Sequence, residues 1–239
     1  MSEATPTTVT YDTADELASA TADRLAAALA SAQAARGTAS VVLTGGRTGG
    51  AVLAALRSAA LDWSSLDIYW GDERFLPAGD PERNETQARA ALLDHVPVAP
   101  ARVHAMAPSD GEFGDDPDAA AEAYAVLLKD VPTFDVCLLG VGEEGHTASI
   151  FPHSPAVLES ARTVVAVRDC PKPPPTRVSL TLPRIRTAAA VWLMTTGAAK
   201  ADAVAAALAG AAEQDIPAAG ARGQRETLWI LDRSAASAR

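Results

Sequence analysis

The sequence predicts an α/β protein, with a mostly parallel, Rossmann-like open sheet flanked by helices. Apolar segments of strand length alternate along the chain with alanine-rich segments of helical length, which is the pattern of repeated β-α units. Several apolar segments run directly into glycine-rich or charged turns. Ligands bind at the carboxyl ends of strands in open parallel sheets, so we expect the functional residues in these turns.

The first element is expected to be a helix over residues 12–36. This Ala/Leu-rich stretch has Asp and Glu in its first turn and ends at Arg36-Gly37, which suits the helix dipole and a glycine stop. Strands are expected at residues 39–44, 66–70, 134–140, 163–168, 177–182, 190–196 and 227–231. Further helices are expected near residues 48–60, 84–94, 117–130 and 198–209.

Length and composition indicate a single α/β domain over residues 1–239, because 48% hydrophobic content suffices for one core. The 20 basic and 30 acidic residues give a formal charge of −10, which argues against nucleic-acid and membrane partners. Cys137 and Cys170 lack metal-site spacing, so neither a metal nor a disulfide framework is expected. No signal-peptide or transmembrane pattern occurs, so a cytoplasmic location is expected. The oligomeric state stays open and is compatible with a monomer.

Residues 43–50, LTGGRTGG, are expected to lead from a strand through a glycine-rich turn into a helix. Glycines let the backbone approach an anion, and N–H groups at a helix start attract phosphate, so Gly45 and Gly46 are candidate ligands through their backbones. The pattern is neither G-x-G-x-x-G nor a Walker A motif, and it does not predict nucleotide binding. On its own it is equally compatible with an ordinary tight turn.

Residues 69–77, YWGDERFLP, place Asp72, Glu73 and Arg74 directly after an apolar strand. By themselves these residues would be a solvated turn with a local ion pair. At the carboxyl end of a strand, Asp72 and Arg74 become candidate ligands.

Residues 138–155, LLGVGEEGHTASIFPHSP, place His146 after a strand and a glycine-bracketed loop, in the expected first turn of a helix. A helix N-terminus disfavours the imidazolium, so His146 is expected to be neutral near pH 7. Glu144, two residues earlier, can hold the other ring nitrogen. A lone histidine is more often structural, but this position and this partner together predict a general base. Ser149 falls inside the expected helix and is not expected to be a nucleophile.

Two further cations lie near expected strand ends. Arg177 opens a strand, and Lys200 follows a strand that ends in glycine. Lys200 alone would be a surface charge, but cations at three strand ends, with Arg74 as the third, indicate convergence on an anion. The stiff connection DCPKPPP, residues 169–175, is expected near the site because it delivers Arg177.

These stretches resemble the 6-phosphogluconolactonase family, over roughly residues 41–204. The matching motifs, in chain order, are LTGGRTGG, WGDERFLP with RNETQARAALLD, LLGVGEEGHTASIFPHSP, and RVSLTLP with MTTGAAKADAV. The resemblance implies a fold shared with glucosamine-6-phosphate deaminases and ribose-5-phosphate isomerase. It also implies a phosphorylated sugar lactone as substrate and no metal or organic cofactor.

The chain departs from the family's usual pattern at three positions. Arg47 stands where the family usually has Ser or Thr, Arg83 where a Ser commonly precedes Asn84, and Glu144 where Asp is commoner. Either carboxylate can orient an imidazole. The resemblance places Asn84 and Arg47 among the substrate-binding residues, and the sequence leaves open whether Arg47 or Arg83 joins the phosphate site.

The expected function is hydrolysis of 6-phospho-D-glucono-1,5-lactone to 6-phospho-D-gluconate, in the oxidative pentose phosphate pathway. His146 would activate water and Glu144 would orient it, while Asp72 would orient Arg74 or a sugar hydroxyl. The groups expected to hold the 6-phosphate are Arg74, Lys200, Arg177 and the N–H groups of Gly45 and Gly46. Two alternatives stay open, a sugar-phosphate isomerase or deaminase and a non-catalytic sugar-phosphate sensor. The segment TASIFP argues against the first, and the short acidic N-terminal region lacks the DNA-binding module expected of the second.

Overall fold

The computed structural model of the chain describes residues 5–238, which form two sheets. A six-stranded sheet has the order β1-β9-β8-β5-β2-β3, and a three-stranded sheet has the order β4-β7-β6. The strands of the large sheet are β1 (Thr7–Tyr11), β2 (Ala39–Leu43), β3 (Leu66–Trp70), β5 (Val136–Gly140), β8 (Ala190–Thr195) and β9 (Glu226–Asp232). Those of the small sheet are β4 (Asp72–Arg74), β6 (Val164–Val167) and β7 (Arg177–Leu180).

The helices alternate with the strands. They are α1 (Ala14–Arg36), α2 (Gly46–Ala55), α3 (Asn84–Ala91), α4 (Pro117–Leu127), α5 (Leu182–Ile185), α6 (Ala201–Leu208) and α7 (Pro217–Gly220). Short 3-10 turns occur at Leu56–Ser58, Trp63–Ser65, Leu93–His95, Pro100–Arg102, Leu128–Asp130 and Ala198–Lys200. None of the helices within residues 5–238 is both long enough and apolar enough to span a membrane.

The longest helix forms as its sequence predicts. The Thr13 side chain accepts a hydrogen bond from the backbone N–H of Glu16, which satisfies a free donor of the first turn, and the helix ends at Arg36. Its buried side chains, Leu17, Leu25 and Leu29 among them, pack into the core. Each such leucine contributes roughly 2 kcal/mol by leaving water.

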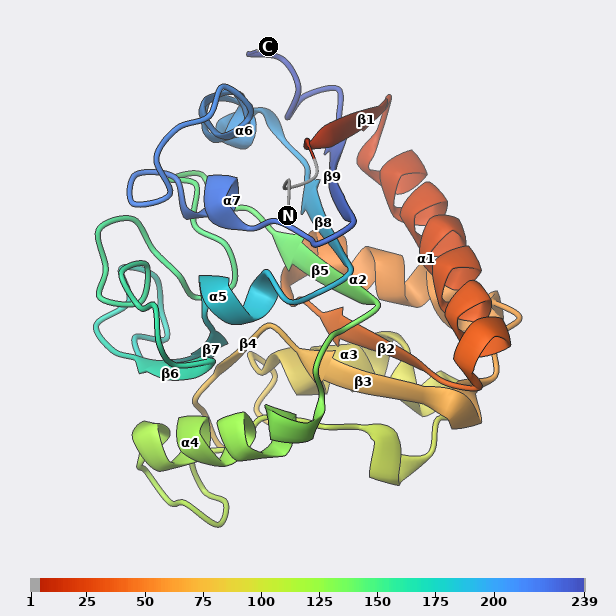
Figure 1. Cartoon of the computed structure of the whole chain (residues 1–239), viewed down its shortest axis with the longest axis vertical. Coiled ribbons are helices and arrows are strands. Elements are labelled where there is room, and N and C mark those ends of the chain that lie inside the picture. Colours follow the sequence, from red (N-terminus) through yellow and green to blue (C-terminus); the bar gives the residue numbers. More distant parts are fainter. Residues whose placement is uncertain (1–4, 239) are drawn as a thin grey trace.

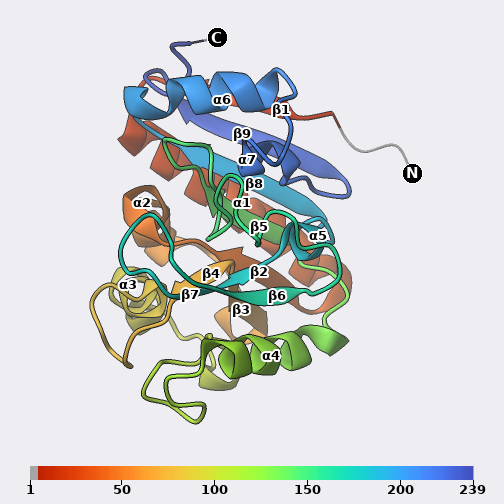
Figure 2. The same cartoon turned by 90° about the vertical axis from the view of Figure 1, so that its left-hand side faces the viewer.

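The molecule is layered. Figures 1 and 2 show α1 on one side of the large sheet and the small sheet with α5 on the other. Helix α2 packs beside α1, and α4 packs against β6 and β7. The small sheet is therefore a second, separate layer, which approaches the large sheet near the carboxyl ends of its strands.

The predicted α/β class and the mostly parallel open sheet are confirmed, because all strand pairs in the large sheet are parallel. Several details of the prediction are wrong. The segments expected as strands at 163–168 and 177–182 leave that sheet and pair antiparallel as β6 and β7. Residues 72–74, expected as a turn, form β4 by pairing with β7. Strand β1, which pairs with β9 at the sheet edge, was not expected.

The order in which successive strands are added to the large sheet reverses direction between β2 and β5. From β2 the chain moves outward to β3, whereas from β5 it moves the other way to β8 and β9. The pairing of β2 with β5 ends at Val42 and Cys137, although β5 continues to Gly140. The loops that follow these two strands therefore diverge, and such a switch point is where open α/β sheets bind ligands.

Candidate active site

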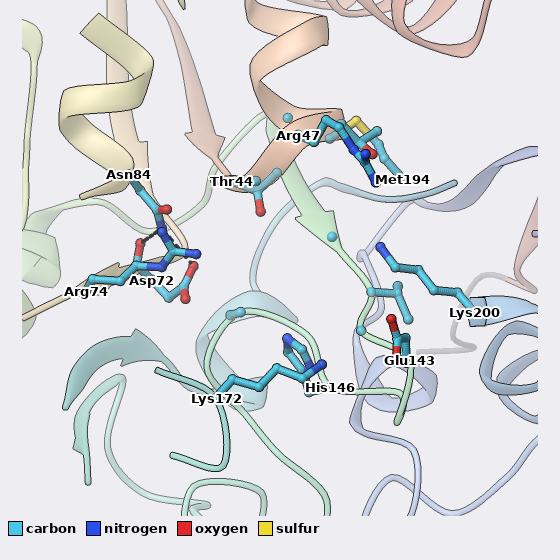
Figure 3. Close-up of a pocket in the computed structure, with 18 of the residues that line it drawn as sticks. Thr44, Arg47, Asp72, Arg74, Asn84, Glu143, His146, Lys172, Met194 and Lys200 are labelled. Carbon is cyan, nitrogen blue, oxygen red and sulfur yellow. Dashed lines mark hydrogen bonds between the residues drawn. The ribbon is translucent and has the colours of Figure 1, made fainter. Parts of the chain in front are cut away.

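A cavity of about 310 Å³ opens at this switch point. The turn after β2, the small sheet, the loop after β5 and the start of α6 all contribute to its wall (Figure 3). The sequence-predicted residues that line it are Gly45, Gly46, Arg47, Asp72, Arg74, Asn84, His146, Arg177 and Lys200. Lining residues that the sequence analysis did not single out include Thr44, Thr48, Glu143, Lys172 and Met194.

The glycine-rich turn brings backbone close to the cavity. Helix α2 begins at Gly46, and its N-cap Gly45 provides no side-chain hydrogen bond to the first turn. A Cβ on Gly45 would stand 1.8 Å from Oδ1 of Asn84, so only glycine fits between this turn and α3. The uncapped N–H groups of α2 and its positive dipole end favour an anion at this wall.

Strand β4 and helix α3 are joined by the buried carboxylate of Glu73. Its two oxygens accept hydrogen bonds from the backbone N–H groups of Arg74 (2.8 Å), Asn84 (2.6 Å) and Glu85 (2.8 Å). Burial raises the pKa of Glu73 to about 7, although Arg83 and these N–H groups oppose the shift. Glu73 thus fixes Arg74 and Asn84 relative to each other at one side of the cavity.

Asp72 is held by side chains from two other parts of the chain. Ser149 donates to its Oδ2 (2.6 Å), and Nδ2 of Asn84 donates to its backbone oxygen (2.8 Å) and its Oδ1 (3.3 Å). Arg177 in turn donates to the Ser149 hydroxyl (3.4 Å). Ser149 is fully buried and its proton is engaged by Asp72, so its position does not suit a nucleophile.

The loop after β5 is not helical, so the expected helix start at His146 is wrong. Residues 141–149 form turns, and Thr147 donates its hydroxyl proton back to the backbone oxygen of Gly140 (2.9 Å). Thr147 and Ile150 are buried and bridge each other, which folds the segment into a tight loop instead. The helix dipole therefore does not act on His146.

Burial, rather than a helix end, lowers the pKa of His146. Its ring stacks on Phe151 with centroids 4.5 Å apart, and its side chain is 17% exposed. Desolvation is the largest cause of the shift; Glu144 opposes it and Lys172 adds to it. The expected outcome, an imidazole that is neutral near pH 7, therefore has a different physical cause from the one the sequence indicated.

Glu144 lies against the imidazole as predicted. Its Oε2 is 3.1 Å from Nδ1 of His146, although the contact is not aligned as a hydrogen bond. Burial by itself would raise the pKa of Glu144, but a hydrogen bond from Lys172, with smaller contributions from His146, lowers it to about 2. The group beside the imidazole is therefore a carboxylate at every physiological pH.

Lys172 is a site residue that sequence reasoning missed. Its Nζ donates to Oε2 of Glu144 at 2.8 Å, and its side chain lines the cavity. It lies in the stiff 169–175 connection, which was expected near the site, so the signal was a lysine inside a proline-rich segment. Figure 3 shows Lys172 beside His146 at one wall.

The cations face the cavity from different sides. Arg47 and Lys200 approach from one side and Arg74 from the other (Figure 3). Burial, followed by repulsion from Lys172 and Arg47, lowers the pKa of Lys200. A bound anion would relieve this repulsion. The Nε of Arg74 is buried and finds no hydrogen-bond partner among residues 5–238.

Arg177 and Arg83 differ from this set. Arg177 lines the cavity, but its Nε donates to the backbone oxygen of Pro174 and its Nη2 to those of Lys172 and Pro173. Arg83 is fully buried outside the cavity wall and donates to backbone oxygens of Leu76 and Met106. Of the two arginines left open by the sequence, Arg47 is the one at the cavity.

Groups of three or more His, Cys, Asp and Glu side chains placed to hold a metal ion are absent from residues 5–238. Nor do the glycine-rich turn and the cavity carry a nucleotide-binding motif. The arrangement places a neutral, carboxylate-oriented imidazole beside several cations, which suits proton transfer on an anionic substrate.

Known proteins resemble this chain in both sequence and fold. A family model described as Glucosamine-6-phosphate isomerases/6-phosphogluconolactonase matches residues 12–229. The 6-phosphogluconolactonase of Streptomyces coelicolor is 57% identical over 98% of this chain and 94% of its own. That of Mycobacterium tuberculosis is 53% identical over 93% of this chain and 94% of its own.

Solved structures share the fold. The 6-phosphogluconolactonase of Trypanosoma brucei has a TM-score of 0.86 at 29% identity and covers 99% of each chain. A monomeric glucosamine-6-phosphate deaminase has a TM-score of 0.82 at 22% identity, covering 97% of this chain and 99% of its own, and shows the common fold alone. By its family match and its relatives, this chain belongs to the 6-phosphogluconolactonase family, within the wider group of glucosamine-6-phosphate isomerases and 6-phosphogluconolactonases.

Proposed function

We propose that the protein hydrolyses 6-phospho-D-glucono-1,5-lactone to 6-phospho-D-gluconate, with His146 as the general base. The observation that carries the proposal is the buried imidazole, oriented by Glu144, in the wall of a cavity that also holds Arg47, Arg74 and Lys200. The S. coelicolor and M. tuberculosis relatives bear the name of this lactonase and support the reaction.

In the proposed mechanism the proton moves through one ring nitrogen of His146. The carboxylate of Glu144 beside Nδ1 favours the tautomer with its proton there, which leaves the lone pair on Nε2. Nε2 takes a proton from water as the water oxygen bonds to the lactone carbonyl carbon. When the tetrahedral intermediate collapses, the bond from that carbon to the ring oxygen breaks, and Nε2 returns the proton to the departing oxygen. The new carboxylic acid then ionises.

The non-reacting end of the substrate positions its carbonyl. Arg74 and Lys200, with Arg47 and the N–H groups of Gly45 and Gly46, would hold the 6-phosphate. Asp72 and Asn84 would accept hydrogen bonds from sugar hydroxyls, since both are buried at the wall and Oδ1 of Asn84 has no partner among the described residues. Arg177 already donates hydrogen bonds from Nε and Nη2 to the backbone oxygens of residues 172–174, so its direct contribution to phosphate binding would be small.

The test of this function is lactone hydrolysis by the purified protein, with glucosamine-6-phosphate and ribose-5-phosphate as parallel substrates. The lactone also opens spontaneously, so the rate is measured above that background. We expect hydrolysis of the lactone alone, unchanged by EDTA. Turnover of either sugar phosphate would instead support an isomerase or deaminase, and binding without turnover would support a sensor.

Gly142 provides a test of the imidazole's placement. A Cβ on Gly142 would stand 2.0 Å from Nδ1 of His146 and 2.7 Å from Oε2 of Glu144. Both are side-chain atoms, so an alanine displaces the imidazole and the carboxylate more than the backbone. We expect Gly142→Ala to lower kcat by about tenfold, because misplacement of a catalytic group is costly, while the melting temperature changes little. Steady-state kinetics and a thermal melt measure the two effects. An unchanged kcat would contradict the role of this pair.

A further inference from the structure

One carboxylate oxygen serves two partners at the cavity wall. Oε2 of Glu144 lies 2.8 Å from Nζ of Lys172 and 3.1 Å from Nδ1 of His146. A carboxylate oxygen has two lone pairs, so it can face a cation and an imidazole at once. The ammonium therefore fixes the position of the carboxylate that orients the imidazole.

The backbone that carries Lys172 is itself anchored. Nη2 of Arg177 donates to the backbone oxygens of Lys172 (3.0 Å) and Pro173 (3.1 Å), and its Nε donates to that of Pro174 (3.2 Å). Arg177 is buried on β7, and its guanidinium also lies over the Phe151 ring, 5.7 Å from the centroid. His146 stacks on the same ring. One guanidinium thus holds both the loop that carries Lys172 and the ring on which the imidazole stacks.

Three charged groups act on the imidazole. Glu144 from its own loop and Asp72 from β4 favour the imidazolium, whereas Lys172 from the 169–175 connection disfavours it. Lys200 and Arg74 face the same cavity from farther along its wall. A carboxylate beside an imidazole normally raises the pKa of the ring, and the base would then be protonated at neutral pH. Burial is the largest effect that opposes this one, and Lys172 adds to it while leaving the carboxylate in place.

We propose that Lys172 is a positioning residue, which fixes Glu144 against His146, and that it is not a ligand of the substrate phosphate. The inference rests on the proposed role of His146 as the base. It assigns to the proline-rich connection a function in tuning that base, with Arg177 as its anchor.

The direct measurement is an NMR titration of His146 in protein labelled at histidine, without substrate. The signal of His146, one of four histidines, is identified by its loss in His146→Ala. In Lys172→Met the midpoint is expected to rise by about half a unit to one unit, because a nearby cation is removed while Glu144 and Asp72 still favour the imidazolium. Lys129→Met, which removes the same charge from an exposed position, should leave the midpoint unchanged. An unchanged or lower midpoint in Lys172→Met overturns the proposal.

Kinetics separate positioning from substrate binding. Lys172→Met is expected to lower kcat roughly three- to tenfold on both 6-phosphogluconolactone and unphosphorylated glucono-1,5-lactone, and to move the acid limb of kcat/KM to higher pH. Lys172→Arg should restore much of the loss. In a Glu144→Gln background, Lys172→Met should cost much less than in the wild type, because its partner is altered. A loss confined to the phosphorylated substrate, or an equal loss in the Glu144→Gln background, would make Lys172 a substrate ligand.

The two proposals fail in different ways. If the wild type does not hydrolyse the lactone, or if His146→Ala is fully active, the proposed function fails. If hydrolysis depends on His146 but Lys172→Met shifts neither the titration nor the pH profile, the role of Lys172 alone fails.

Discussion

Replacing His146 with alanine is expected to lower kcat by on the order of a hundredfold or more, the usual contribution of a general base. Alanine cannot take the proton from the attacking water. The binding of 6-phosphogluconate should stay within a few-fold, because the imidazole is not among the groups assigned to the phosphate. Steady-state kinetics and product binding by calorimetry measure the two effects. Wild-type-like turnover in this variant would end the proposed mechanism.

The pH dependence of the wild type provides the matching control. Only neutral His146 has a lone pair on Nε2, so kcat/KM should rise as the pH increases through the pKa of the imidazole. Burial places that pKa below the ordinary histidine value, so the rate should be flat across neutral pH. The limb should be absent from the residual rate of His146→Ala. An acid limb centred above the ordinary value would contradict the electrostatics described for this site.

Replacing Arg74 or Lys200 with alanine is expected to raise KM for the phosphorylated lactone strongly. The loss of one charge-assisted contact should weaken the binding free energy by roughly 1.5–3 kcal/mol. The two side chains face the cavity from opposite sides, and the pKa of Lys200 is already lowered by burial and by neighbouring cations. A variant that lacks either cation can therefore no longer hold the phosphate dianion from both sides, and its binding of the phosphorylated lactone weakens.

Unphosphorylated glucono-1,5-lactone is the control for this pair. It has no group for these cations to hold, so its low kcat/KM should barely change in either variant, whereas His146→Ala should slow both lactones. Equal losses on both substrates from Arg74→Ala would mean that Arg74 supports the fold or the reacting carbonyl. The phosphate would then lie nearer to Arg47 and Lys200, which approach the cavity together.

The sequence predicted the parts of the fold that local patterns determine. The helix at 12–36 was expected from its acidic first turn and its glycine stop, and α1 spans Ala14–Arg36. The strands that carry the switch point were expected from continuous apolar runs, which both faces of a covered parallel sheet require. The location of the cavity followed from these strands, because ligands bind at their carboxyl ends.

Features that depend on pairing between distant segments of the chain could not be predicted from the sequence. The strand pattern at 177–180 is the same whether the segment joins a parallel sheet or pairs antiparallel with β4, and only the three-dimensional partner decides. Strand β1 has the polar sequence TTVTY and becomes a strand because β9 lies beside it. The stretch after His146 had the composition of a helix start. It forms a tight loop instead, in which Ile150 and Phe151 are buried. Lys172 was missed because its partner Glu144 lies 28 residues away.

The reversal of chain direction between β2 and β5 has a mechanical consequence. Arg74 belongs to the part of the chain built outward from β2, whereas Lys200 follows β8 on the other side of the reversal. A sugar phosphate held by both would span the line along which the two halves of the sheet meet. Because it binds only the folded chain, at a hundred times its Kd it would add about 2.7 kcal/mol to the free energy of unfolding. The substrate would then act as a brace that resists the separation of the two halves.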